Sequence, residues 1–240
     1  MSNEDRNSRN GTTVERWQQA GNSGLLEDAL RQIKRRDGAE NKINGQRVDT
    51  EEYRERRNRE DESALEELAK KQRCWLEDAD AELKKKYGEM IGHGAESFVY
   101  RKDDETVIKS RTIDPNVGGG YRTYQEALDS IAIHNKLFPE TAMDVAGFGR
   151  SEGEFCVIIN QLYIEGYCYA TTETIMQYVA ENFDAEKDDS VLGGQSYKNG
   201  LYLLQDLKPK NVIVKDVDGC QRLFVIDGDF YYAKRNEVWE

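Results

Sequence analysis

The sequence contains few of the residues that build metal centres. Its 240 residues include four cysteines and two histidines, and no two cysteines have the Cys-x-x-Cys spacing. The cysteines are Cys74, Cys156, Cys168 and Cys220, and the histidines are His93 and His134. We therefore expect reduced, partly buried thiols rather than a zinc site.

Long apolar runs and an excess of positive charge are also missing. No stretch is long and apolar enough to span a bilayer, and the opening MSNEDRNSRNGTT lacks the basic and apolar regions of a signal peptide. The composition is 38% hydrophobic and 33% charged, with a formal net charge of -12. A soluble, acidic, cytoplasmic protein is therefore expected, without a membrane partner, and nucleic-acid binding is disfavoured. The length allows one sizeable domain or two small ones.

Helical patterns dominate the first part of the chain. Residues 1–22 are rich in Asn, Ser, Arg and Gly and are expected to form a disordered tail. Residues 23–88 are expected to form a helical extension of three helices. The first helix would have Asn22 or Ser23 as its cap and Gly38 as its end. Its apolar stripe consists of Leu26, Ala29, Leu30 and Ile33.

The second and third helices have short apolar stripes. The second is expected to begin near Asp49, which would form a capping box with Glu52. Its part before Ser63 is almost wholly charged and is interpreted as a solvated helix or a linker. The third helix lies in CWLEDADAELKKKYGEMIG, and its apolar face consists of Leu76, Ala79, Leu83 and Tyr87. These helices are interpreted as an appendage of a larger domain.

The rest of the chain alternates between β-rich and helical patterns. Residues 97–110 and 146–166 are typical of β-hairpins, and residues 121–138 between them are typical of a helix that ends at a proline. A further helix is expected over 171–183. Residues 201–230 then have the pattern strand, loop, strand, turn, strand. This order predicts an α+β fold.

Four short motifs occur in a fixed order in this part of the chain. IGHGAESFVY is a glycine-rich hairpin, and TVIKS ends a short strand at Lys109. LLQDLKPKNVIV places one of only three prolines in a polar loop between Asp206 and Asn211. RLFVIDGDF is an apolar strand that ends at Asp227. Each motif has a simpler alternative, such as a hairpin turn, an exposed strand lysine or an Asp-Gly turn.

In this order the motifs resemble those of the protein-kinase superfamily. The resemblance implies a two-lobed kinase-like fold, with a small N-lobe sheet over 89–162 and a truncated C-lobe over 163–240. More narrowly, GAESFVY, HNKLFPET, INQLYIEG and the loop at Asp206 resemble the small Ser/Thr/Tyr kinase-like domains of polyvalent proteins from bacterial mobile elements. That resemblance covers the chain from Leu65 to the carboxyl end and includes the helix with Trp75.

The resemblance implies ATP-dependent phosphoryl transfer, with ATP and Mg²⁺ as cofactors. Lys109 would hold the α- and β-phosphates and pair with Glu126, or with Asp129 as the alternative. Ser97 stands where the third glycine of the loop usually lies. The nucleotide-binding residues implied are Gly92, Gly94, Val99, Lys109, Glu126, Gln161 and Tyr163, the last two through backbone hydrogen bonds to adenine.

The polar loop would supply the catalytic groups. Asp206 would accept the proton of the attacking hydroxyl group, and Lys208 would neutralise charge on the γ-phosphoryl group. Asn211 and Asp227 would bind Mg²⁺ through oxygen atoms. Pro209 would stiffen the loop.

Several features depart from the kinase pattern. Leu204 and Gln205 replace the usual His and Arg, and the Gly228-Asp229 pair after Asp227 is closer to small-molecule kinases. Thirteen residues follow Asp227, so we expect a minimal C-lobe, a truncated one, or one that a partner completes. The phosphate acceptor would be an unknown protein or small molecule. The alternatives are a pseudokinase-like nucleotide-binding interaction module and an α+β binding domain in which DLKPKN is only a loop.

Overall fold

The computed structural model consists of two compact units. Unit 1 contains Met1–Ala132 and Ala142–Tyr163, and unit 2 contains Ile133–Thr141 and Ile164–Glu240. The described residues are 24–40, 50–94, 96–117, 120–165, 168–189 and 195–233. The predicted tail therefore lies outside the described residues, and the helical extension is part of unit 1.

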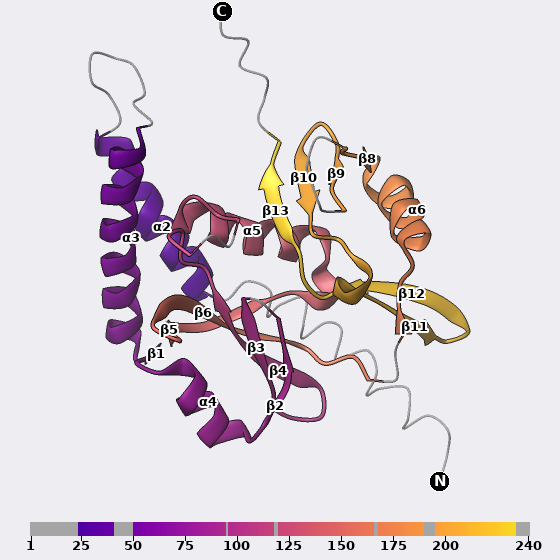
Figure 1. The fold of residues 1–240 in the computed structure, drawn as a ribbon, viewed down its shortest axis with the longest axis horizontal. Coiled ribbons are helices and arrows are strands. Elements are labelled where there is room, and N and C mark those ends of the chain that lie inside the picture. Colours follow the sequence, from indigo (N-terminus) through magenta and orange to yellow (C-terminus); the bar gives the residue numbers. More distant parts are fainter. Residues whose placement is uncertain are drawn as a thin grey trace, which may run out of the picture. The chain divides into compact units, whose positions relative to one another are not determined.

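A six-stranded sheet forms the centre of unit 1 (Figure 1). Its strand order is β1-β5-β6-β4-β3-β2, and only β1 pairs in parallel, with β5. The strands are β1 (Trp75–Leu76), β2 (Met90–His93), β3 (Ser97–Arg101), β4 (Thr106–Thr112), β5 (Asp144–Ser151) and β6 (Glu154–Leu162). Both predicted hairpins are present, as β3–β4 and β5–β6, and each consists of two apolar, β-rich segments on either side of a polar tip.

Helices cover both faces of this sheet. The helices of unit 1 are α2 (Gly24–Glu40), α3 (Glu51–Gln72), α4 (Ala79–Tyr87) and α5 (Tyr124–Leu137), whose last turn belongs to unit 2. Helix α4 packs Ala79 and Leu83 against one face, where Ile108, Cys156 and Ile158 are buried. On the other face, the Tyr124 ring of α5 lies edge-on to Phe155 of β6, with 5.1 Å between the ring centroids.

Three expectations for the N-terminal helices are wrong in detail. Helix α3 is capped by Thr50, whose Oγ1 accepts the N–H of Tyr53 at 3.2 Å. Its first half is more than a solvated helix or linker, because Asn58 and Asp61 are 6% and 1% exposed. The third helix begins only at Ala79, with Asp78 as its cap. The preceding Trp75–Leu76 pairs with β5 instead, because the strand edge there offers free backbone groups.

Unit 2 contains one long helix and two small sheets. Strands β13-β10-β9-β8 form one sheet and β12-β11-β7 the other. The elements are η1 (Pro139–Thr141), β7 (Cys168–Tyr169), α6 (Thr172–Phe183), β8 (Glu186–Lys187), β9 (Tyr197–Lys198), β10 (Tyr202–Gln205), η2 (Pro209–Asn211), β11 (Val212–Val217), β12 (Cys220–Val225) and β13 (Asp229–Tyr232). Thr171, one of the two predicted caps, caps α6.

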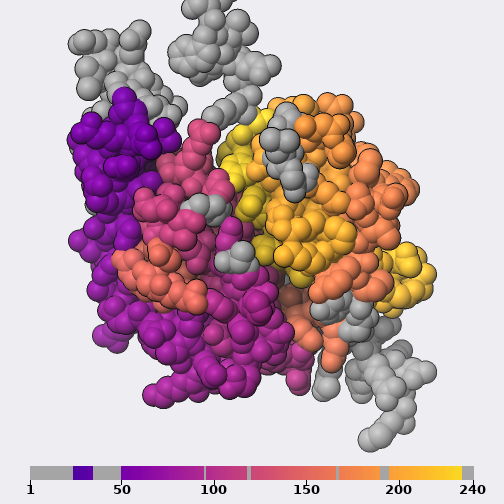
Figure 2. All heavy atoms as spheres, in the orientation of Figure 1, coloured from indigo at the N-terminus to yellow at the C-terminus, as the bar shows by residue number. Residues whose placement is uncertain are grey.

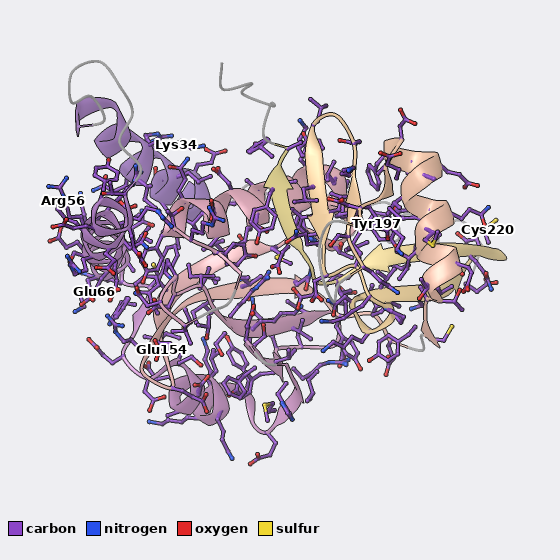
Figure 3. All side chains as sticks on the ribbon, turned by 45° about the horizontal axis from the view of Figure 1, so that its top comes forward. Lys34, Arg56, Glu66, Glu154, Tyr197 and Cys220 are labelled. Carbon is purple, nitrogen blue, oxygen red and sulfur yellow. The ribbon has the colours of Figure 1, made fainter. Side chains whose placement is uncertain are left out.

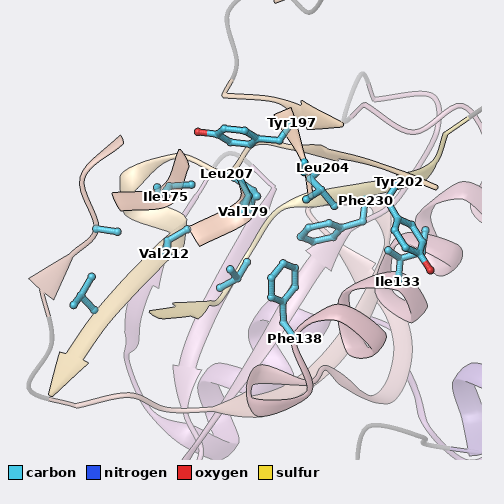
Figure 4. Packing of buried hydrophobic residues seen from close by; sticks show 14 residues of the cluster. Ile133, Phe138, Ile175, Val179, Tyr197, Tyr202, Leu204, Leu207, Val212 and Phe230 are labelled. Atoms are coloured by element: carbon cyan, nitrogen blue, oxygen red, sulfur yellow. The ribbon is translucent and has the colours of Figure 1, made fainter. Parts of the chain in front are cut away.

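The core of unit 2 forms around a group of aromatic rings (Figure 4). Phe138 and Phe230 lie 5.5 Å apart between ring centroids, and His134 contacts both rings. Leu204 and Leu207 are 1% and 0% exposed. These two leucines flank Gln205 and Asp206, so burial fixes the chain on both sides of the start of the polar loop.

None of the described helices is long and apolar enough to cross a membrane. All four cysteines are free thiols, and they differ in exposure: Cys156 is buried, Cys74 is partly buried, and Cys168 and Cys220 are exposed.

Candidate active site

The predicted catalytic loop connects β10 to β11 in unit 2. Asp206 adopts a left-handed backbone with φ of 56°, a conformation that aspartate tolerates better than most side chains and that often occurs at functional sites. One carboxylate oxygen, Oδ1, accepts from Lys208 Nζ at 2.5 Å, and the other accepts from Asn211 Nδ2 at 2.9 Å. The loop therefore brings three predicted site residues into direct contact.

The loop has its own internal hydrogen bonds. Pro209 opens a short 3₁₀ turn, and the Asn211 N–H donates to the Lys208 carbonyl at 2.8 Å. The Asn211 amide also donates to the Asp206 carbonyl at 2.8 Å. Asn211 is 6% exposed. Because the Asn211 amide group donates to both the carbonyl and the carboxylate of Asp206, its Oδ1 is oriented away from that residue.

Asp227 lies beside this loop because two backbone pairings bracket it. On one side, the Ile226 N–H donates to the Asn211 carbonyl at 2.9 Å. On the other side, Asp229 pairs with Gln205 in the β10–β13 ladder. Two segments that are separated in the sequence therefore place Asp227 next to Asp206 and Asn211.

This part of unit 2 fits a magnesium ion bound together with phosphates. Asn211 and Asp227 offer amide and carboxylate oxygens, the ligands that Mg²⁺ prefers. Among the described residues, no three His, Cys, Asp or Glu side chains lie close enough to hold a metal ion by themselves. A site of two protein ligands completed by substrate phosphates is the usual arrangement for Mg²⁺ in phosphoryl-transfer enzymes.

The remaining predicted residues belong to unit 1. Lys109 is on the central strand β4 and is 8% exposed. It pairs across the sheet with Val99 of β3 and Ile159 of β6, and Gly92 of β2 pairs with Val99. Directly paired residues share one face of a sheet. Gly92, Val99 and Lys109 therefore lie on one face, which is the face that α5 covers.

The glycine-rich turn is closed by a backbone hydrogen bond. The Gly94 N–H donates to the Ser97 carbonyl at 2.8 Å, between β2 and β3. An added Cβ at Gly94 would meet nothing within 4 Å, and one at Gly92 would lie 3.9 Å from Val99 Cβ. A ligand can therefore approach the backbone of this hairpin without meeting a side chain at either glycine.

The residues predicted to bind adenine, Gln161 and Tyr163, lie at the end of strand β6 and just after it. Gln161 is 1% exposed and pairs with Val107 on the Lys109 face. The Tyr163 N–H donates to the Glu105 carbonyl at 2.8 Å, and Arg101 lies over the Tyr163 ring at 3.6 Å. Because the Tyr163 N–H already donates to Glu105, a backbone hydrogen bond between Tyr163 and adenine would be accepted by the Tyr163 carbonyl oxygen.

The two candidate partners of Lys109 have other contacts. The Glu126 carboxylate accepts the N–H of Arg122 at 2.8 Å, and its own N–H donates to Thr123 Oγ1 at 3.1 Å. This arrangement resembles a capping box at the start of α5. Asp129 instead accepts from Lys34 of α2 at 3.1 Å. The pairing of Lys109 with Glu126 remains a prediction.

The sequence interpretation missed the polar residues of α3 that contact α5. Asn58 Nδ2 donates to the Arg122 carbonyl at 3.0 Å, and Glu62 Oε2 accepts from the Tyr124 hydroxyl at 2.9 Å. A signal for them was present, because the apolar stripe of Leu65 and Ala69 extends backward at helical spacing to positions 58 and 62. Polar residues at those positions predict a solvated surface, whereas in the structure Asn58 is buried and Glu62 half-buried, and both bind the start of α5.

The mixed α+β architecture, the loop around Asp206 and the strand lysine together define the class of the protein kinases and related phosphotransferases. The chain belongs to the family described as serine/threonine/tyrosine kinase found in polyvalent proteins, whose model matches residues 58–234. Searches of curated proteins and of solved structures gave no match. The family resemblance expected from the sequence is thereby confirmed.

Proposed function

We propose that the protein transfers the γ-phosphate of ATP to a hydroxyl group in a Mg²⁺-dependent reaction. The observation that carries this proposal is the contact of Asp206 with both Lys208 and Asn211, with Asp227 bracketed beside them. A lysine, a carboxylate and an amide oxygen in this arrangement match what phosphoryl transfer requires. The family description adds serine, threonine or tyrosine hydroxyls as candidate acceptors.

Each residue would have a defined task. Asp206 would orient the attacking hydroxyl and accept its proton, and the contact with Lys208 Nζ keeps an ammonium group beside that carboxylate. Asn211 and Asp227 would hold Mg²⁺, which when bound neutralises charge on the phosphates. In unit 1, Lys109 would bind the phosphates from a rigid strand, which limits the entropy lost on binding.

The test compares three aspartate-to-asparagine variants in an assay with ATP labelled at the γ-phosphate. Asp206→Asn should bind ATP normally and lose about 100-fold or more in transfer, because an amide cannot accept the proton. Asp227→Asn should weaken Mg²⁺-dependent ATP binding as well. Asp218→Asn is the matched control, because Asp218 is exposed and has φ of 54°, close to the 56° of Asp206.

The outcomes separate the candidate functions. Transfer that vanishes in Asp206→Asn and Asp227→Asn but persists in Asp218→Asn supports the proposal. Intact Mg²⁺-ATP binding without transfer in the wild type would favour a nucleotide-binding interaction module. Turnover that is unchanged in Asp206→Asn would exclude the catalytic role given to this residue.

A further inference from the structure

Helix α3 holds the first turn of α5 through a set of polar contacts within unit 1. The Tyr124 hydroxyl donates to Glu62 Oε2 at 2.9 Å, and Asn58 Nδ2 donates to the Arg122 carbonyl at 3.0 Å. Tyr124 is the first residue of α5, and Arg122 lies two residues before it. The three-residue segment 122–124 is therefore fixed by hydrogen bonds to a different helix.

These contacts are too buried to be ordinary surface pairs. Tyr124 is 0% exposed and Asn58 is 6% exposed. Burial, together with the charges of Asp114 and Glu62, raises the pKa of the Tyr124 hydroxyl, which keeps it protonated as a donor. Breaking such a contact leaves a buried polar group without its partner, so the arrangement strongly favours one position of the helix.

Glu62 connects three elements at once. Its Oε1 accepts from Arg150 of β5, while its Oε2 accepts from Tyr124 of α5. In Figure 2 the salmon atoms of the β5–β6 turn adjoin the purple atoms of the N-terminal helices. By contrast, Arg56 on the same helix projects away from the sheet, with its side chain 55% exposed (Figure 3). Only one side of α3 therefore takes part.

The same turn of α5 carries the carboxylate expected to serve Lys109. Asn58 binds the carbonyl of Arg122, and Glu126 binds the N–H of that same residue at 2.8 Å. Tyr124 packs on Phe155, on the face of the sheet that carries Lys109. A shift of this turn would therefore move Glu126 and would also displace the Tyr124 ring from Phe155, on the face of the sheet that carries Lys109.

We propose that Asn58 and Glu62 are positioning residues, which fix the first turn of α5 so that unit 1 presents its nucleotide-binding groups in the geometry required for transfer. The inference rests on the proposed function. Neither residue is placed in contact with ATP or the acceptor. They act through Arg122 and Tyr124, so helix α3 is a working part of the domain and not an appendage.

The experiment uses the full chain and four substitutions. Tyr124→Phe removes only the hydroxyl group, and Glu62→Leu removes the acceptor. Glu62→Gln keeps one oxygen that can accept from Tyr124 but gives up the acceptor of Arg150, so it is the conservative variant that isolates the Tyr124 contact. Glu67→Gln is the matched control, because Glu67 is an exposed glutamate on the same helix. ATP affinity, transfer at saturating ATP and hydrogen exchange at residues 122–129 are measured for each, well below its Tm.

A positioning role predicts a split between binding and turnover. We expect Glu62→Leu to lower turnover about tenfold and Tyr124→Phe several-fold, with ATP affinity within about twofold of wild type. Exchange at residues 122–129 should rise in both, and Glu62→Gln and Glu67→Gln should keep more than about half of the turnover. A role in stability alone would lower the Tm without changing turnover per folded molecule, and that result would overturn the proposal.

Failure of the proposed function gives a different result. If the wild type binds ATP but transfers no phosphate, the phosphotransferase assignment fails, and exchange then decides whether α3 positions the helix. Unchanged exchange at residues 122–129 in both Tyr124→Phe and Glu62→Leu would overturn the positioning role. Faster exchange confined to that segment, with the Glu62→Gln variant unchanged, would support it.

Discussion

The parallel pairing of β1 with β5 depends on glycine in β5, and Gly149→Ala should break it. An added Cβ at Gly149 would lie 2.4 Å from the Leu76 carbonyl oxygen and 3.0 Å from Leu76 Cβ. Cβ atoms are essentially never found closer than 3.0 Å to a heavy atom that is not bonded to them or to their chain neighbours. The Leu76 carbonyl oxygen of β1 must therefore move away from its present 2.4 Å to at least 3.0 Å. A backbone carbonyl in a paired strand cannot rotate aside as a side chain can.

The magnitude follows from the contacts that such a shift would weaken. Overpacking of this kind costs about 1–3 kcal/mol. The hydrogen bond from the Phe148 N–H to the Cys74 carbonyl, 3.1 Å long, would be stretched at a further cost of about 1 kcal/mol. We therefore expect Gly149→Ala to lower the free energy of unfolding by about 3 kcal/mol in total.

Urea unfolding followed by circular dichroism measures this loss, and hydrogen exchange of the Phe148 amide locates it. Gly92→Ala is the control in the same unit, because its Cβ would meet Val99 Cβ at an ordinary 3.9 Å. That variant should differ from wild type by less than about 1 kcal/mol. Equal stability of the two variants, with the Phe148 amide still protected, would refute the close approach of β1 to β5.

Two further predictions concern packing in unit 2 and a thiol in unit 1. Gly228→Ala would place a Cβ 2.8 Å from Phe230 Cζ, so the free energy of unfolding should fall by about 2 kcal/mol and Mg²⁺-ATP should bind more weakly. At Gly200 an added Cβ would meet nothing within 4 Å, so Gly200→Ala should change neither quantity. Burial raises the pKa of the Cys156 thiol from 9.0 to about 12. As the pH rises, the unfolded chain loses this proton before the folded chain does. The free energy of unfolding should therefore fall above pH 9 by up to about 1.4 kcal/mol per pH unit. Urea unfolding at pH 8 and pH 10 measures this fall, and a Cys156→Ala variant should not show it.

The hairpins, the helices and the loop around Asp206 were predictable because their information is local. Two short apolar, β-rich runs around a polar tip in SFVYRKDDETVIKS marked β3 and β4, and helical spacing marked α5 and α6. The contacts among Asp206, Lys208 and Asn211 span only six positions, so a sequence match to a known loop is enough to predict that these side chains lie together. The family match over residues 58–234 confirms that these local signals belonged together.

Contacts between distant segments were not predictable in the same way. Asn58 and Asp61 are polar, and a charged helix is usually solvated, so pattern alone assigned them to the surface. Their burial depends on partners such as Arg122, which is 64 positions from Asn58. The strand at Trp75–Leu76 was missed for a related reason, because its pairing is with Phe148 and Gly149 and its own sequence continues a helical stripe.

The boundary of the family match bears on which contacts of the N-terminal helices matter for positioning. The match begins at residue 58, so it includes both Asn58, which binds the Arg122 carbonyl, and Glu62, which binds Tyr124. The contact from α2, Lys34 with Asp129, precedes the match, and its lysine side chain is 52% exposed. An exposed ion pair contributes about 0–1 kcal/mol, while a buried hydrogen bond leaves an unsatisfied group when it is broken. Removing the Lys34 side chain should therefore affect α5 far less than removing the acceptor at Glu62, and α3 rather than α2 sets the position of the helix.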